Sequence, residues 1–285
     1  MSKIIVENVS YVYSEKTPFE AVALNDVSIS IEKNKITGII GHTGSGKSTL
    51  VQMFNGLIKP TRGRILLDGE DIWEKPREIG KIRFRVGLVM QYPEYQLFEE
   101  TVKADIAFGP RNMGLDEEEI NKRIYECADF VGLETSLLEK SPFDLSGGQK
   151  RRVAIAGVMA MKPDVLVLDE PAAGLDPIGR NSIFGGIRKY AEVTGASVVI
   201  VSHSMEDMAR YCDDIIVMSD SKVAMTGNRN EIFSRAEELE SIGLDVPEIT
   251  KLMMMLRDRG ANIPSGIYTV EDAEKCLLEV LGGGV

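Results

Sequence analysis

The amino-acid sequence predicts an α/β fold built on a mainly parallel β-sheet, and three observations support this prediction. Four short apolar segments rich in β-branched residues have the length of buried strands: KITGII (35–40), DVLVLD (164–169), SVVIVS (197–202) and DIIVMS (214–219). Segments with helical periodicity lie between them, an alternation typical of parallel sheets covered by helices on both faces. The β-branched runs of residues 4–31, interrupted by SEKTPFE, indicate an additional antiparallel part.

The helices are predicted from apolar periodicity and from residues that start or stop a helix. They fall at 47–57, closed by Gly56, within 101–140 and most clearly at 116–133, and at 149–161 and 178–193. Asp68 and Gly69 mark a turn between two strand-like segments. Residues 231–285 form a separate helical segment, in which Asp245 and Pro247 suit the start of one helix and TVED (269–272) resembles a capping box for the last.

The composition is that of an ordinary globular protein. The chain has 285 residues, of which 44% are hydrophobic and 27% charged, enough to bury a sizeable core. Its net charge of −11 disfavours a nucleic-acid or anionic-membrane surface. Three scattered cysteines suit a reducing cytosol. We find no signal-peptide pattern and no apolar run of about 18 residues, so we expect any membrane role to depend on partners.

A glycine-rich motif predicts a phosphate-binding site. GHTGSGKST (41–49) satisfies G-x-x-x-x-G-K-[ST] and stands between a predicted strand and a predicted helix. We expect its residues to bind a nucleotide with Mg²⁺, Lys47 reaching the β- and γ-phosphates and the Ser48 hydroxyl ligating the metal. The predicted nucleotide-binding residues of this motif are Gly41, His42, Thr43, Gly44, Ser45, Gly46, Lys47, Ser48 and Thr49.

The strand DVLVLD ends in two acids that complete a hydrolytic site. Asp169 is placed at the carboxyl end of the strand, where α/β sheets bind ligands, and we expect it to hold Mg²⁺ through water. Glu170 follows it and can orient and deprotonate the attacking water. Either acid alone would suit a simple strand end, but together with the phosphate-binding loop they predict nucleotide hydrolysis.

A second anion-binding arrangement opens the helix at 149–161. In LSGGQ (145–149), a serine and two glycines precede the helix, where backbone N–H groups can bind phosphate. Ser146 alone would be an ordinary N-cap residue. This pentapeptide is too specific for that interpretation to suffice.

With these motifs the sequence resembles the ATP-binding cassette (ABC) family over residues 4–233. The resemblance implies a P-loop NTPase with a parallel core, an antiparallel β-subdomain and a helical subdomain at about 92–160. It also implies two ATPases arranged head to tail, so that the LSGGQ residues of one bind the ATP of the other. The residues serving the partner's ATP would be Ser146, Gly147, Gly148 and Gln149.

The same resemblance assigns four further positions. Asp176 would link the two ATP sites, and His203 would contact the γ-phosphate and help to position water. Gln91, placed at the end of the apolar run RVGLVM (85–90) that looks like a buried strand, would touch Mg²⁺ or the attacking water. Tyr13 would stack on adenine, with Tyr11 or Phe19 as alternatives.

Within the family, QYPEYQLFEETV (91–102) followed by DIAFGPRNMGL looks like the ATPases of energy-coupling factor (ECF) transporters, closest to the second of their two ATPase subunits. This implies uptake of vitamins or transition-metal ions at the cytoplasmic face of a prokaryotic cell membrane. It implies a paralogous ATPase partner, with a homodimer left open, a membrane scaffold subunit docking at Gln91–Val102, and a substrate-capturing membrane subunit. The resemblance also implies an arginine on the scaffold, with Glu94, Glu99 and Glu100 as the carboxylates that could receive it. The aromatics Tyr92, Tyr95 and Phe98 would complete the docking surface.

Residues 1–230 would thus form the ATP-binding domain and residues 231–285 a helical extension. Ile249, Leu252, Met253 and Leu256 form one predicted helical stripe. The stripe suits packing on the chain's own ATPase domain, whereas the resemblance implies contact between the two ATPases. A soluble single-cassette ATPase, such as an iron–sulfur cluster assembly subunit, is the alternative function.

Overall fold

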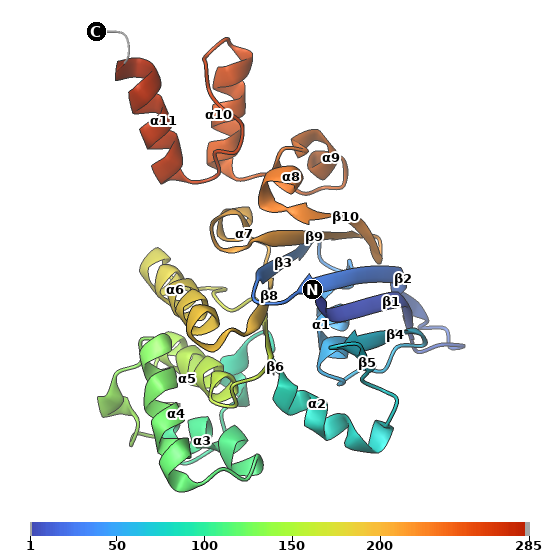
Figure 1. Ribbon diagram of the computed structural model, residues 1–285, viewed down its shortest axis with the longest axis vertical. Helices are drawn as coiled ribbons and strands as arrows, with labels where there is room; N and C mark the ends of the chain where they lie inside the picture. Colours follow the sequence, from blue (N-terminus) through green and yellow to red (C-terminus); the bar gives the residue numbers. More distant parts are fainter. Residues whose placement is uncertain (1, 283–285) are drawn as a thin grey trace.

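The computed structural model describes residues 2–282 and places them in two β-sheets surrounded by helices. A six-stranded sheet has the order β10-β9-β3-β8-β7-β6, and a four-stranded sheet has the order β2-β1-β4-β5, within these residues. In Figure 1 the small sheet and α1 lie on one side of the large sheet, and α3–α6 lie on the other. Met1 and residues 283–285, which belong to the two predicted segments, lie outside the described residues.

The strands are β1 (Ser2–Tyr13), β2 (Ala21–Glu32), β3 (Ile36–Gly41), β4 (Arg62–Leu67), β5 (Glu70–Asp71), β6 (Val86–Val89), β7 (Val165–Asp169), β8 (Ser197–Val201), β9 (Asp214–Ser219) and β10 (Lys222–Asn228). The α-helices are α1 (Lys47–Phe54), α2 (Ile79–Arg85), α3 (Val102–Asn112), α4 (Glu117–Phe130), α5 (Gly147–Met159), α6 (Pro177–Thr194), α7 (Met205–Tyr211), α8 (Arg229–Phe233), α9 (Ala236–Ser241), α10 (Glu248–Asp258) and α11 (Val270–Gly282). Short 3₁₀ helices are η1 (Pro76–Glu78), η2 (Pro93–Gln96), η3 (Thr135–Leu137) and η4 (Pro142–Asp144).

The large sheet is parallel except for its edge strand β10, as the alternation of strands and helices predicts. Every residue of β3, β7 and β8 is buried. Because side chains alternate along a strand, Leu166 and Leu168 pack with the helices, and Val165 and Val167 pack on the side of the small sheet. The sheet therefore has an apolar layer on each face.

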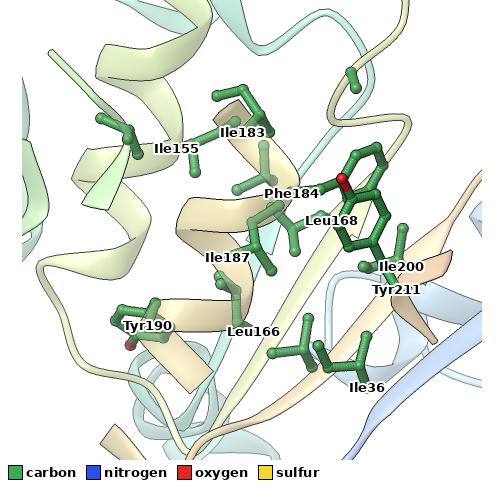
Figure 2. Close-up of a cluster of buried hydrophobic side chains, with 14 of the residues drawn as sticks. Ile36, Ile155, Leu166, Leu168, Ile183, Phe184, Ile187, Tyr190, Ile200 and Tyr211 are labelled. Carbon is green, nitrogen blue, oxygen red and sulfur yellow. The ribbon is translucent and has the colours of Figure 1, made fainter. Parts of the chain in front are cut away.

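The helix-facing layer fixes the long helix α6 on the sheet. Figure 2 shows Ile183, Phe184 and Ile187 of α6 within this buried apolar layer, with Ile183 beside Ile155 of α5. The ring of Phe184 stacks on that of Tyr211 at the end of α7, with 4.7 Å between their centroids. This packing holds the segments before α6 and α7 in place, and those segments carry Asp176 and His203.

The small antiparallel sheet confirms the predicted β-rich start of the chain. Strand β1 pairs with both β2 and β4, and Ile5 lies opposite Ser30 on one side and Leu66 on the other. The hairpin of β1 and β2 brings Tyr13 close to Ala21. This end of the sheet lies beside the glycine-rich loop.

The C-terminal helices α10 and α11 form a separate unit that projects from the end of the molecule in Figure 1. Thr269 caps α11, because its hydroxyl accepts a 3.2 Å hydrogen bond from the Asp272 N–H, as the TVED pattern predicts. The predicted stripe on α10 is divided. Ile249, Met253 and Leu256 pack in a small core of this unit, whereas Leu252 is exposed.

No helix within residues 2–282 combines the length and the apolar composition that a bilayer-crossing segment needs. The three cysteines are free thiols. Burial raises the pKa of Cys127 to about 12, so this thiol is an unreactive core residue.

Candidate nucleotide-hydrolysis site

A cavity of about 380 Å³ opens where β3, β7 and β8 reach their carboxyl ends. Its wall combines residues from the β1–β2 hairpin, the glycine-rich loop, the segment after β6 and the ends of β7 and β8. The lining residues are Tyr13, Ala21, Val22, Ala23, Thr43, Gly44, Gly46, Lys47, Ser48, Thr49, Gln91, Asp169, Glu170, Val201 and His203. Most residues predicted to bind nucleotide or metal thus meet in one place.

The glycine-rich loop presents the start of α1 to this cavity. Gly46 precedes the first helical residue and has no side chain to cap the free N–H groups, which leaves them available to phosphate oxygens. Its φ of +97° favours glycine, and a Cβ there would lie 2.3 Å from the carbonyl oxygen of Ala23. The close approach of β2 to the loop therefore requires glycine at this position.

Lys47 is buried at the start of α1, and its Nζ lies inside the loop. It donates hydrogen bonds of 2.7 Å to the Gly41 carbonyl and 2.9 Å to the His42 carbonyl. Burial lowers the pKa of Lys47, while the nearby carboxylates of Glu170 and Asp169 oppose this shift. The loop therefore curls around the ammonium group that we expect to bind the β- and γ-phosphates.

Gly41, His42 and Ser45 do not line the cavity, although they belong to the predicted nucleotide-binding motif. Gly41 ends β3, and the His42 Nδ1 lies 2.9 Å from the carbonyl oxygen of Thr43. Ser45 is fully buried, and its hydroxyl has no hydrogen-bond partner within the part of the chain that the structure describes. These three residues therefore belong to the part of the loop that faces away from the cavity.

The residues expected at a magnesium ion supply oxygen atoms of the kind that Mg²⁺ prefers. Asp169 is buried and bonded to Ser48, and Gln91 lines the same cavity. Burial raises the pKa of Asp169, an effect that the Ser48 hydroxyl and the charge of Lys47 oppose. Residues 2–282 contain no cluster of three acidic, histidine or cysteine side chains that could hold a metal alone. The donor set suits Mg²⁺ that shares its shell with phosphate oxygens and water.

Glu170 has the geometry and electrostatics of a proton acceptor. Its backbone φ of +54° is uncommon for a non-glycine residue, and its N–H is anchored to the Val201 carbonyl at 2.9 Å. One carboxylate oxygen, Oε1, is buried and has no hydrogen-bond partner within residues 2–282. Burial raises the pKa of Glu170, and the negative charge of Asp169 raises it further. A carboxylate in this environment is more basic than one in water.

His203 lies beside Glu170 at the end of β8. Its Nε2 is 3.6 Å from the Glu170 Oε1, longer than a hydrogen bond, and half of the side chain is exposed. Burial lowers the pKa of His203, and the positive charge of Lys47 lowers it further. The neutral imidazole is thus favoured next to the acid.

Tyr13 is the one aromatic of the three adenine-stacking candidates that lines the cavity. Its hydroxyl lies 3.1 Å from the hydroxyl of Thr49, and its ring meets the ring of Tyr11 edge to face. Tyr11 packs against the core, and Phe19 is 81% exposed away from the cavity wall. The geometry therefore favours Tyr13 among these candidates.

The LSGGQ residues and Asp176 do not line the cavity. Ser146 caps α5 in a capping box with Gln149, and Asp176 caps α6 by accepting a 2.6 Å bond from the Gly179 N–H. Ser146, Gly147 and Asp176 are exposed. These residues face outward from the chain that carries them, in agreement with a role at another subunit's nucleotide.

The segment after β6 differs from its prediction in two details. The strand ends at Val89, so Gln91 lies in the following bend, from which it still reaches the cavity. Glu94, one of the three carboxylates expected to receive a partner's arginine, is already bound to Arg151 of α5 through two hydrogen bonds of 2.8 and 3.1 Å. Glu100 remains exposed and Glu99 partly exposed.

Sequence analysis missed several residues of the site. Ala21–Ala23 and Val201 line the cavity without belonging to any motif, since only the pairing of β1 with β2 and of β7 with β8 brings them there. Outside the cavity, the pairing of Arg151 with Glu94 was also missed, because the two residues are distant in the sequence.

Comparison with known proteins agrees with this site. The ABC transporter family matches residues 24–173. Two curated relatives, from Caldanaerobacter subterraneus subsp. tengcongensis and from Clostridium acetobutylicum, are both named "Energy-coupling factor transporter ATP-binding protein EcfA2". The first is 54% identical over 280 residues, and the second is 54% identical over 279 residues. Each alignment covers 98% of this chain and 98% of the relative.

Solved structures give the same result. CbiO1 from Clostridium perfringens, part of the ABC transporter complex CbiONQ, has a TM-score of 0.75 and 40% identity and covers 89% of this chain and 99% of its own. The bacterial ABC transporter cassette MJ0796, solved as a dimer and also with ADP and Pi after hydrolysis, has a TM-score of 0.72 and 30% identity. It covers 79% of this chain and 98% of its own.

The fold and the cavity therefore define an ATPase, and the chain belongs to the ABC transporter family, among the ATP-binding proteins of energy-coupling factor transporters. The predicted fold class and the predicted ATPase activity are confirmed. The alternative, a soluble iron–sulfur cluster assembly ATPase, is not favoured.

Proposed function

We propose that this chain is one of two ATPase subunits that energise an ECF-type importer from the cytoplasmic face of a prokaryotic membrane. The observation that carries the proposal is the separation of its two phosphate-binding elements. The glycine-rich loop lines the cavity, whereas Ser146 and Gly147 are exposed outside it. Such a chain completes two ATP sites only with a second ATPase, for which a paralogous subunit is the expected partner.

In the proposed reaction, the N–H groups at the start of α1 and the Lys47 ammonium bind the phosphates of ATP. Ser48 with Gln91, and Asp169 through water, would hold Mg²⁺, which would supply charge to stabilise the transferred phosphoryl group. Glu170 accepts a proton from the water that attacks the γ-phosphorus, while the bond to ADP breaks. The neutral His203 orients the γ-phosphate and the water.

The docking site for the membrane scaffold is proposed at Gln91–Val102. Tyr92, Tyr95 and Phe98 are 52%, 84% and 57% exposed, an apolar surface that a partner would cover. The arginine of the scaffold then pairs with Glu99 or Glu100, since Arg151 already occupies Glu94. A substrate-capturing membrane subunit completes the importer, with a vitamin or a transition-metal ion as cargo.

The C-terminal unit suits contact with the second ATPase. Leu252 and Met255 on α10 and Leu278 on α11 are each about half exposed or more. Burial of these side chains against an equivalent unit would remove their apolar surface from water.

Co-purification tests this function. The tagged chain is isolated from its native membrane with mild detergent, its partners are identified, and ATP hydrolysis is measured with and without Mg²⁺. We expect a second ATPase and a multi-span membrane protein, with turnover that requires Mg²⁺. Isolation of soluble scaffold proteins alone would refute the importer assignment.

A further inference from the structure

Arg151 on α5 connects two segments that are distant in the sequence. Its Nε and one terminal nitrogen donate to both carboxylate oxygens of Glu94, at 3.1 and 2.8 Å. Its other terminal nitrogen donates to the carbonyl oxygen of Ala173. One planar guanidinium group thus binds a carboxylate on one side and a backbone carbonyl on the other.

The connection is rigid because it is buried. The side chains of Arg151 and Glu94 are only 6% and 15% exposed. A bidentate arginine–carboxylate pair fixes both distance and orientation, and its strength increases where water is excluded. A shift of Glu94 therefore moves the guanidinium group, and the Ala173 carbonyl moves with it.

Glu94 and Ala173 belong to segments with different tasks. Glu94 lies in η2, within the proposed docking segment Gln91–Val102. Ala173 follows Glu170 in a turn, and its N–H donates to the Glu170 carbonyl at 3.3 Å. The same loop continues to Asp176, which starts α6. Arg151 thus joins the docking segment to the loop that carries the proposed catalytic base.

We propose that Arg151 is a positioning residue that transmits movement of the docking segment to the loop 170–176 and so sets the placement of Glu170. This inference rests on the proposed roles of Glu170 and of the docking segment. Arg151 does not line the cavity. Its effect on hydrolysis is exerted through the Ala173 carbonyl.

Arg123 on α4 is a matched control within the same helical region. It also binds a glutamate, Glu119, at 2.7 Å, and backbone carbonyls, those of Ala160 and Met161 at 3.1 and 3.3 Å. Its side chain is 14% exposed. These contacts hold the C-terminal end of α5, which does not line the cavity. Arg123 therefore has a comparable structural role, but none of its bonding partners lies in the loop 170–176.

The experiment measures ATP hydrolysis by the assembled, co-purified transporter over a range of ATP concentrations. The variants are Arg151→Met, Arg151→Lys, Glu94→Gln and the double variant that combines Arg151→Met with Glu94→Gln. Arg123→Met is the control, and Glu170→Gln is the inactive standard. Thermal unfolding and partner recovery are recorded for each. Lysine retains the charge but cannot bind Glu94 in a bidentate manner and Ala173 at the same time.

We expect Arg151→Met to lower kcat on the order of 10- to 100-fold, the size of effect produced by displacing a reacting group by about 1 Å. The ATP concentration for half-maximal rate should remain within about threefold, because phosphate binding is untouched. Arg151→Lys should also be slow. Glu94→Gln should lower kcat less, and the double variant should be no slower than Arg151→Met, since both substitutions act through one connection.

Turnover within about twofold of the original in Arg151→Lys and Glu94→Gln would overturn the inference, and these two variants decide it if Arg151→Met fails to assemble. An equal loss of kcat in Arg123→Met would also overturn it, because that loss would be merely structural. Normal turnover in Glu170→Gln would instead refute the proposed catalytic base. Loss in Glu170→Gln with normal turnover in all Arg151 variants would leave the proposed function intact and reject only this connection.

Discussion

Replacing Glu170 by glutamine separates its chemical role from its structural one. The two side chains have nearly the same shape, so the change removes a charge and a basic oxygen while it keeps the packing. In the native chain the Oε1 atom is buried without a hydrogen-bond partner among the residues that the structure describes, and the charge of Asp169 lies nearby. The substitution should therefore damage catalysis while it relieves an unfavourable interaction.

The magnitudes follow from these contacts. Loss of a general base lowers turnover by about 10²- to 10⁴-fold. Replacement of a buried carboxylate by a neutral amide removes the charge, whose desolvation costs about 1–3 kcal/mol. For a chain of this size, each kcal/mol raises Tm by about 2–4 °C. ATP should also remain bound more firmly, because a negative charge next to its phosphates is gone.

The pH dependence gives an independent check. The pKa of Glu170 is raised from its ordinary value of 4.5 in the folded chain, so protonation stabilises the native state at low pH. That stabilisation is lost as the pH rises through the raised pKa. Glutamine does not titrate, so the stability advantage of the variant should be small below about pH 4 and should reach its full size above the raised pKa of Glu170.

Thermal unfolding from pH 4 to 8, ATP hydrolysis by the assembled transporter and retention of labelled ATP test this reasoning. We expect a more stable, ATP-retaining and nearly inactive variant at neutral pH. Near-normal hydrolysis in the assembled transporter would refute the assignment of Glu170 as base. A variant less stable than the native chain at pH 8 would refute the electrostatic argument.

Substitutions at three further positions address the other parts of the protein's proposed function. Gly46→Ala should reduce ATP affinity at least tenfold in a nucleotide-binding titration. The reason is that an L-residue with positive φ costs about 1–2 kcal/mol and that the new methyl group meets the Ala23 carbonyl. Unchanged affinity would show that the loop adapts. Tyr13→Phe should keep ATP affinity within about threefold, since it loses only the contact with Thr49. Tyr13→Ala should lose about 1–3 kcal/mol of binding free energy from stacking. Equal ATP affinities of the two variants would exclude adenine stacking by Tyr13. Glu100→Lys should reduce co-purification of the membrane scaffold while Glu100→Gln has a smaller effect, and full recovery with lysine would exclude Glu100 as the receiving carboxylate.

Local patterns predict the parts of this structure that local interactions determine. The strand at 165–169 begins with four consecutive apolar residues, and both of its faces are buried. The glycine-rich loop requires positive φ and an uncapped helix start, and a short run of consecutive residues is enough to predict both features. TVED caps α11 because the bonding atoms are only three residues apart.

Contacts between distant residues explain what the sequence did not reveal. The pairing of Glu94 with Arg151 joins residues 57 positions apart, and nothing near either one marks the other as its partner. The same holds for Ala23, which becomes part of the cavity only through the hairpin of β1 and β2. On α10, periodicity places Leu252 with Met253, but the short unit formed with α11 covers only part of that face.

The arrangement of caps suits the proposed division of each ATP site between two chains. The start of α1 has no side-chain cap, so its N–H groups are available to a ligand of the same chain. The start of α5 is capped by Ser146 and Gln149 within the chain, and its exposed glycine N–H groups can meet a phosphate presented from outside. The outward-facing site is thus stable when the subunits separate. Arg151 lies on the same helix and binds Glu94 of η2. Contact of a partner ATPase with the start of α5 and docking of the scaffold on η2 would therefore both act on α5.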